Sequence, residues 1–199
     1  MKVRTNMFLR GIVLLVLAMG VVGIAYGQNE AGDMMEPAQT NVSYEGPNGV
    51  QLQGYLATPS GSGPFPAVLM VHEWWGLNKD TARLANALSR EGHVVLAADA
   101  FWGSVAQSPS KAMEQVRGTP SEQIAADLDA ALEYLKSRSD VDSSRVASLG
   151  FCFGGTQSMY MGTRRGDLAA VVIFYGGGPI TDANRLGSMQ QAAPVLGIY

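Results

Sequence analysis

Cysteine and histidine are scarce in this chain of 199 residues, which contains one cysteine and two histidines. A single cysteine cannot form a disulfide bond within the chain, nor supply a cysteine-rich metal site. A dithiol redox mechanism would also lack its second cysteine. Two histidines are too few for a site built from several imidazole ligands. We therefore expect neither a cysteine-rich nor a multi-histidine metal site.

A basic excess is also missing, because 14 lysines and arginines face 17 aspartates and glutamates, for a net charge of −3. Proteins that bind nucleic acid need a basic surface, so a nucleic-acid partner is not expected. After residue 27 no apolar run is long enough to span a membrane. We expect a monomer whose partner is a small-molecule substrate.

The first 27 residues are typical of a secretory signal peptide. Three basic residues open the segment, namely Lys2, Arg4 and Arg10. Residues 11–25 are uncharged and mostly apolar, and small residues at positions 25 and 27 predict cleavage before Gln28. Cleavage would change the net charge from −3 to −6, because those three basic residues are lost. An uncleaved membrane anchor is the alternative, but the apolar run is shorter than a membrane-spanning helix, which needs about 20 residues. We expect export, to the periplasm or as a secreted protein.

Residues 28–40 are polar and are interpreted as a flexible spacer before a domain that covers residues 41–199. Alternating apolar and polar residues at 42–44 and 50–56 surround Asn48-Gly49. This pattern predicts an antiparallel hairpin.

Continuous apolar runs then alternate with amphipathic segments. Strands are predicted at 66–71, 93–98, 145–149, 168–174 and 194–199, and helices at about 79–90, 110–116, 120–135 and 154–162. The fold class is therefore α/β, with a doubly wound, mostly parallel sheet after the N-terminal hairpin. Because the chain ends in an apolar strand, we expect a domain that is incomplete at its C-terminus, without its last strand or strands and their helices. The hypothesis is an N-terminal fragment of a longer product.

The single cysteine lies in the sequence Gly150-Phe151-Cys152-Phe153-Gly154-Gly155, between a predicted strand and a predicted helix. This pattern is typical of the nucleophile elbow of an α/β-hydrolase, with sulfur in place of the serine oxygen. A side chain at Gly150 or Gly154 would collide with nearby backbone in such a turn. The N-terminus of the following helix should favour the thiolate. A buried core cysteine is the alternative, and the flanking glycines favour catalysis.

Two more segments follow predicted parallel strands, at the sheet edge where α/β proteins place their sites. They read His72-Glu73-Trp74-Trp75-Gly76 and Asp99-Ala100-Phe101-Trp102-Gly103. With the elbow, they resemble the dienelactone hydrolase family, which is carboxymethylenebutenolidase-like and belongs to the α/β-hydrolases. The resemblance covers about residues 42–199.

The resemblance implies a hydrolase of a small ester or lactone that works through a thioester and needs no metal ion and no cofactor. Cys152 would attack the carbonyl, Glu73 would help to activate the thiol, and the backbone N–H groups of Trp74 and Phe153 would bind the oxyanion. A carboxylate beside two tryptophans should be partly desolvated, which raises its pKa. The alternative for Glu73 is a solvated or helix-capping carboxylate.

Aromatic residues near the sheet edge are candidates for the walls of a substrate pocket, although they are also common in cores. The candidates are Trp75, Phe101 and Trp102. His72 should point to the opposite side of its strand from Glu73, so a structural role is expected. His93 is interpreted in the same way.

The family completes its catalytic triad with an aspartate and a later histidine, both after the nucleophile. In this sequence no histidine follows Cys152, and the 199 residues end before the expected aspartate position. Asp182 is a weak candidate for the triad acid. The 199-residue chain is therefore expected to be a poor catalyst, and a non-catalytic ligand-binding homologue is the alternative function. Residues 100–104 lack the arginine that some members use for a substrate carboxylate, so the dienelactone substrate itself is in doubt. A class I amidotransferase also uses a cysteine elbow, but Glu73-Trp74-Trp75-Gly76 fits it poorly.

Overall fold

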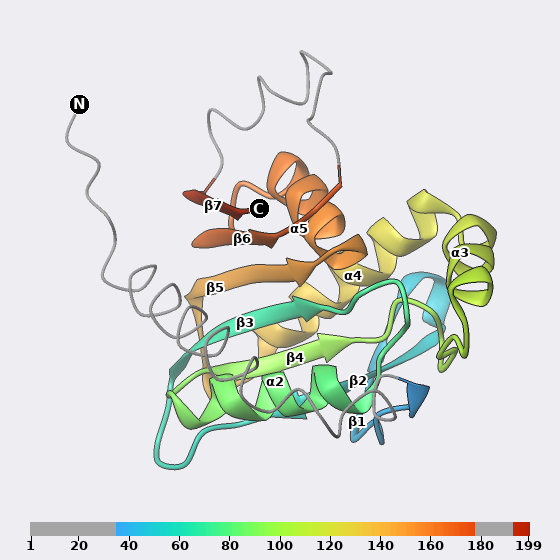
Figure 1. Ribbon diagram of the computed structural model, residues 1–199. Helices are drawn as coiled ribbons and strands as arrows, with labels where there is room; N and C mark the ends of the chain where they lie inside the picture. Colours follow the sequence, from blue (N-terminus) through green and yellow to red (C-terminus); the bar gives the residue numbers. More distant parts are fainter. Residues whose placement is uncertain (1–34, 178–192) are drawn as a thin grey trace. The chain divides into compact units, whose positions relative to one another are not determined.

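The computed structural model describes residues 35–177 and 193–199, and these form a seven-stranded sheet with helices against it (Figure 1). The strand order within the described residues is β1-β2-β4-β3-β5-β6-β7. This arrangement confirms the predicted α/β class with a mostly parallel sheet. The predicted leader and Asp182 lie outside the described residues.

The sheet begins with the predicted antiparallel hairpin, formed by β1 (Val42–Glu45) and β2 (Gln51–Ala57). A short turn, η2 (Pro47–Gly49), joins them. Asn48 and Gly49 have φ values of 56° and 76° in this turn. Asparagine and glycine are the residues that adopt this left-handed region most readily, so the local sequence explains the hairpin.

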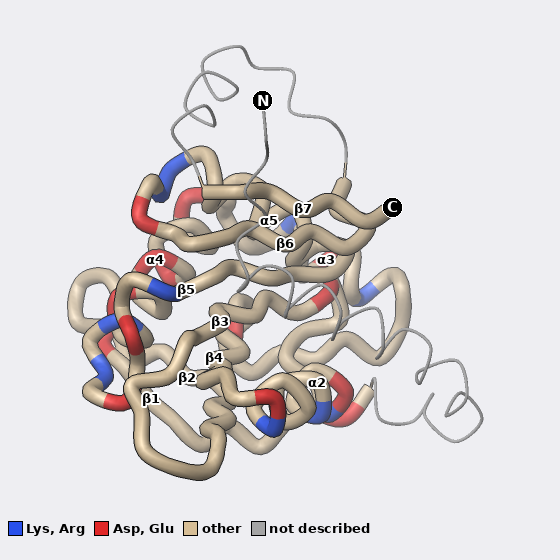
Figure 2. The backbone as a smooth tube through the Cα atoms, turned by 90° about the vertical axis from the view of Figure 1, so that its left-hand side faces the viewer, with Lys and Arg blue, Asp and Glu red and all other residues tan. Residues whose placement is uncertain are grey.

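Strand β2 then pairs antiparallel with β4 (Val94–Ala98), and all later pairings are parallel. The remaining strands are β3 (Phe65–Val71), β5 (Val141–Phe151), β6 (Ala170–Phe174) and β7 (Val195–Ile198). Figure 2 shows β3, β4 and β6 without charged residues, as expected of strands whose two faces are covered. Strand β5 begins at Val141, earlier than predicted. Its first residues are polar and partly exposed, and they pair with β3 across a register irregularity.

Helices cover both faces of the sheet (Figure 1). They are α2 (Lys79–Arg90), α3 (Pro109–Gly118), α4 (Ser121–Ser137) and α5 (Phe153–Arg164). Asn78 caps α2 by accepting a hydrogen bond of 3.0 Å from the Thr81 N–H. Leucines of α4 and methionines of α5 pack against one face of the central strands to form the main core.

Residues 35–40 belong to the domain surface, although they were predicted as part of a flexible spacer. Pro37 forms a β-bridge with Asn78, and the Ala38 N–H donates to the Leu77 carbonyl at 3.0 Å. The Lys79 N–H donates to the Glu36 carbonyl, also at 3.0 Å. These backbone bonds satisfy groups that a free spacer would leave to water, so the spacer interpretation is wrong for residues 36–40.

Candidate active site

Cys152 occupies a sharp turn between β5 and α5, with φ of 51° and ψ of −114°. This conformation is strained for any residue except glycine. The Cys152 N–H donates to the Phe174 carbonyl at 3.0 Å, and the Cys152 carbonyl accepts from the Thr156 N–H at 3.1 Å. The predicted strand–turn–helix arrangement around the cysteine is therefore confirmed.

Two glycines permit this turn, as the sequence predicted. A Cβ atom at Gly150 would lie 2.1 Å from the Gly154 carbonyl oxygen. A Cβ atom at Gly154 would lie 2.1 Å from the Val71 oxygen and 2.6 Å from the His72 oxygen. The beginning of α5 therefore sits directly against the end of β3, next to Glu73 and Trp74.

Glu73 is half-buried beside the cysteine and accepts a hydrogen bond of 3.1 Å from the Tyr175 hydroxyl. Burial raises the pKa of Glu73, and the Tyr175 hydrogen bond opposes this rise. The predicted desolvation of Glu73 is therefore confirmed. A carboxylate with a raised pKa is suited to accept a proton near neutral pH.

The thiol of Cys152 does not follow the expected electrostatics. Burial raises its pKa, the Phe153 N–H opposes the rise, and the nearby negative charge of Glu73 adds to it. The amide at the helix N-terminus therefore acts in the predicted direction, but burial outweighs it. The prediction of a favoured thiolate is corrected, since the resting group is a thiol next to a carboxylate.

Tyr175 was missed in the sequence, although it directly follows the predicted strand that becomes β6. Its φ of 38° is in the left-handed region, and its side chain is 53% exposed. Burial and the charge of Glu73 raise the pKa of its hydroxyl well above the usual range, so it remains a hydrogen-bond donor. The rule that singled out Glu73, a polar residue at the carboxyl end of a buried strand, would have found it.

Phe101 and Trp102 have different surroundings. Phe101 is buried, with its ring centroid 5.1 Å from that of His72 and 5.0 Å from that of Phe153, so it belongs to the core. Trp102 donates from its indole nitrogen to Asp127 of α4 at 3.0 Å. Together with Gln51, Gln53 and Asp99 it also lines a surface hollow of about 170 Å³. The role of both residues as walls of a substrate pocket stays a prediction.

Trp75 lies in the loop after β3, next to Glu73, and is half-buried. Its ring meets that of Trp74 edge to face, with centroids 5.3 Å apart. Trp75 follows the same strand as Glu73, and its role as a pocket wall also stays a prediction.

Both histidines have structural environments, as predicted. The His72 ring is buried, and its Nε2 atom accepts from the Ala100 N–H at 3.1 Å. His93 is buried just before β4, and burial lowers its pKa. Among residues 35–177 and 193–199, no three acidic, histidine or cysteine side chains are placed to hold a metal ion.

Known proteins resemble this chain in sequence and in fold. A sequence model described as the dienelactone hydrolase family matches residues 52–199. The protein usf of Aquifex pyrophilus is 36% identical over 65% of this chain and 58% of its own length. A protein of Aquifex aeolicus (strain VF5), provisionally named a carboxymethylenebutenolidase, is 33% identical over 69% of this chain and 62% of its own.

A solved structure titled as a dienelactone hydrolase-like promiscuous phosphotriesterase, from metagenomic libraries, superposes with a TM-score of 0.68. It is 27% identical, and the match covers 80% of this chain and 68% of that one. This chain spans about three fifths of the length of the two curated relatives named above. The strained cysteine turn, the neighbouring glutamate and these matches lead to one conclusion: the chain belongs to the dienelactone hydrolase family.

Proposed function

We propose that the full-length protein is a cysteine-dependent hydrolase of a small ester or lactone. The observation that carries this proposal is the position of Cys152, on a strained turn with the Phe153 N–H at its sulfur and the Glu73 carboxylate near enough to raise the pKa of its thiol. A nucleophile, a proton acceptor and a helix N-terminus are thus within one small region.

In the first step the thiol proton passes to Glu73, and the Cys152 sulfur forms a bond to the substrate carbonyl carbon. The carbonyl electron pair moves to oxygen, and the backbone N–H groups of Phe153 and Trp74 stabilise that negative charge. When the electron pair on the oxygen re-forms the carbonyl, the carbon–oxygen single bond of the ester breaks. The leaving alkoxide takes up the proton held by Glu73. The products are an alcohol and a thioester on Cys152.

In the second step water attacks the thioester carbonyl, the carbon–sulfur bond breaks, and the sulfur regains a proton. Activation of water is the usual task of a histidine oriented by an acid in this class of fold. Both histidines of these 199 residues precede Cys152. We assign the water-activating groups to the part of the relatives' length that this chain does not span.

We propose neutral substrates for this site. Glu73 supplies negative charge, and no described lysine or arginine forms a hydrogen bond or ion pair with Glu73 or Tyr175. An anionic group on the substrate would therefore meet repulsion without a matching cation. The loop after β4, at residues 100–104, also lacks the arginine that could bind a substrate carboxylate.

The test is the hydrolysis of p-nitrophenyl acetate by the full-length protein and by two variants. Cys152→Ala should abolish turnover. Cys152→Ser should fold normally but lose most activity, because the acid–base groups are matched to a thiol. Turnover by Cys152→Ala at the parent rate would contradict the proposal.

A non-catalytic ligand-binding protein is the second candidate, favoured by the absence of a histidine after Cys152 in these residues. The same assay separates the two functions. A binding protein would show saturable protection of the Cys152 thiol by an ester, without release of p-nitrophenol by the full-length protein.

Export remains a proposal that rests on the leader at residues 1–27. No helix within the described residues has the length and apolar character of a membrane span. N-terminal sequencing of the protein recovered from periplasmic or culture fractions tests this proposal. A mature terminus at Gln28 would support cleavage, whereas intact Met1 in the membrane fraction would support the anchor.

A further inference from the structure

The Trp74 N–H can stabilise an oxyanion only if the loop after β3 holds it in one direction. In a trans peptide the carbonyl and the N–H point in opposite directions. The carbonyl of Glu73 and the N–H of Trp74 belong to the same peptide unit. Whatever holds the Glu73 carbonyl therefore also aims the Trp74 N–H.

The side chain of His72 holds that carbonyl. Its Nδ1 atom lies 2.6 Å from the Glu73 oxygen, which also accepts from the Gly76 N–H at 3.2 Å. The other ring nitrogen accepts from the Ala100 N–H at 3.1 Å, so the proton of the neutral ring is on Nδ1. With 1% of its surface exposed, the ring has no room to turn. His72 thus ties the loop after β3 to the loop after β4.

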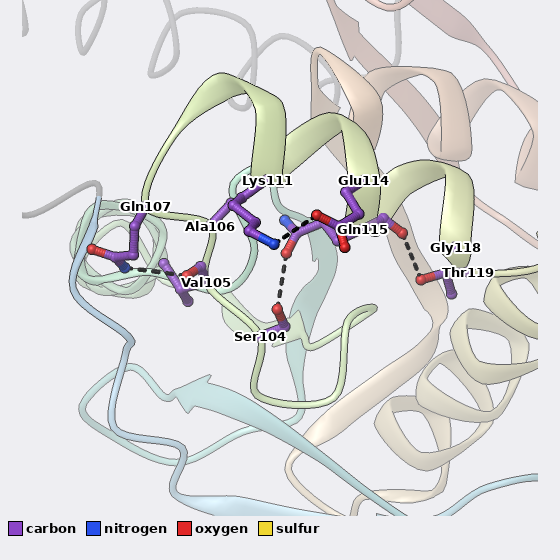
Figure 3. Close-up of a pocket in the computed structure, with 9 residues that line it drawn as sticks. All are labelled: Ser104, Val105, Ala106, Gln107, Lys111, Glu114, Gln115, Gly118 and Thr119. Atoms are coloured by element: carbon purple, nitrogen blue, oxygen red, sulfur yellow. Dashed lines mark hydrogen bonds and ion pairs between the residues drawn. The ribbon is translucent and has the colours of Figure 1, made fainter.

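The next peptide unit is held from α3. The side-chain amide of Gln115 donates to the Trp74 carbonyl, and its oxygen accepts from the Ser104 hydroxyl at 3.0 Å. Figure 3 shows this Ser104–Gln115 bond within the lining of an open hollow of about 600 Å³. The Ala106 N–H donates to the Trp75 carbonyl at 2.8 Å, so three successive carbonyls of the loop have partners.

We propose that His72 and Gln115 are positioning residues of the oxyanion hole, which orient the Trp74 N–H by holding the carbonyls on either side of it. This inference rests on the proposed hydrolase function. Neither side chain contacts the reacting atoms. Each acts through the Glu73-Trp74-Trp75 backbone.

Gln115 offers the cleaner test, because it is only half-buried and faces a hollow. Gln115→Met keeps a helix-forming residue of similar length but removes the donor. Glu114→Met is the matched control on the same helix, since Glu114 is exposed and pairs with Lys111 on the surface. Loss of a whole oxyanion donor costs about a hundredfold to a thousandfold in kcat. We expect Gln115→Met, which misaims a donor without removing it, to lower kcat about tenfold with KM nearly unchanged.

His72 requires a pair of variants, because it is buried. His72→Asn places an amide nitrogen near the position of Nδ1 and can still donate to the Glu73 carbonyl, whereas His72→Leu cannot. We expect His72→Asn to retain more of kcat than His72→Leu, at similar thermal stability. A role in packing alone would predict losses that follow stability and not the donor.

Hydrogen–deuterium exchange of the 73–77 backbone provides a readout that does not require catalysis. We expect faster exchange in Gln115→Met than in the parent and in Glu114→Met. Parent-like exchange and parent-like kcat in Gln115→Met would overturn the inference. If the parent protein hydrolyses no ester, the proposed function fails, and exchange alone still decides whether Gln115 holds the loop.

Discussion

Gly154 offers a sharp test of the site architecture, through the substitution Gly154→Ala. The added Cβ would lie 2.1 Å from the Val71 oxygen and 2.6 Å from the His72 oxygen. Contacts of this kind below 3.0 Å essentially never occur, so α5 and the end of β3 must separate by nearly 1 Å. Both obstacles are backbone atoms, one at the last residue of β3 and one at the buried residue after it, and they cannot rotate away as a side chain could.

Overpacking in a core costs about 1–3 kcal/mol, and the rigid backbone places Gly154→Ala at the upper end, about 3 kcal/mol. At about 2–4 °C per kcal/mol for a domain of this size, the melting temperature should fall by about 6–12 °C. The same separation moves the Phe153 N–H away from the Trp74 N–H, so ester turnover by the full-length protein should fall further than stability alone requires.

Thermal unfolding followed by circular dichroism is the assay, with Gly118→Ala as the matched control. Gly118 ends α3, and a Cβ there meets nothing within 4 Å. That substitution should be neutral or stabilise by about 0.4–1 kcal/mol. If Gly154→Ala melted within about 1 °C of the parent, the argument that α5 is seated on the β3 carbonyls would be refuted.

Three further predictions concern titratable groups. Glu73→Gln removes a negative charge that raises the pKa of Cys152, so iodoacetamide should alkylate this single cysteine about threefold faster at pH 8; an unchanged rate would place the carboxylate too far away to act. Tyr175→Phe removes the hydrogen bond that lowers the pKa of Glu73, so the acid limb of kcat/KM should move to higher pH, and a shift to lower pH would contradict the assignment. Burial lowers the pKa of both His72 and His93, so the unfolded chain takes up their protons at a higher pH than the folded chain does. As the pH falls below about 6.5, stability should therefore decrease by at most about 1.4 kcal/mol per pH unit for each histidine. Glu73 has the opposite effect on stability, because its pKa is raised in the folded protein. The free energy of unfolding of Glu73→Gln should therefore be measured with denaturant from pH 7 to pH 5. Stability of this variant that rises as the pH falls would refute the histidine argument.

The elbow shows how much of the site can be predicted from residue order. Gly150 and Gly154 lie two residues on either side of Cys152, and their steric role depends only on the geometry of a tight strand-to-helix turn. Glu73 could be singled out as well, because it follows a continuous apolar run and the carboxyl ends of parallel strands gather at one edge. These inferences use local pattern and one general rule of sheet topology.

The aromatic residues show where that reasoning stops. Phe101 and Trp102 are adjacent in sequence and both follow β4, yet one is buried in the core and the other is 56% exposed beside Asp127. Periodicity could not separate them, because both lie in the turn after β4, where strand alternation no longer applies, and Trp102 has a φ of 51°. The balance of charges at Cys152 was equally inaccessible, since burial outweighs the helix N-terminus only after the chain has packed.

Residue order is enough to predict the strands, the helices and the turn that carries the cysteine, because these depend on side-chain periodicity and on steric limits within a few residues. Which groups act on that turn depends on the packing of the folded chain. Tyr175 reaches Glu73 across 102 positions of sequence, and Gln115 reaches the Trp74 carbonyl across 41. Such contacts depend on how whole elements pack, and a hydrogen bond forms only where packing brings a donor within about 3 Å of an acceptor.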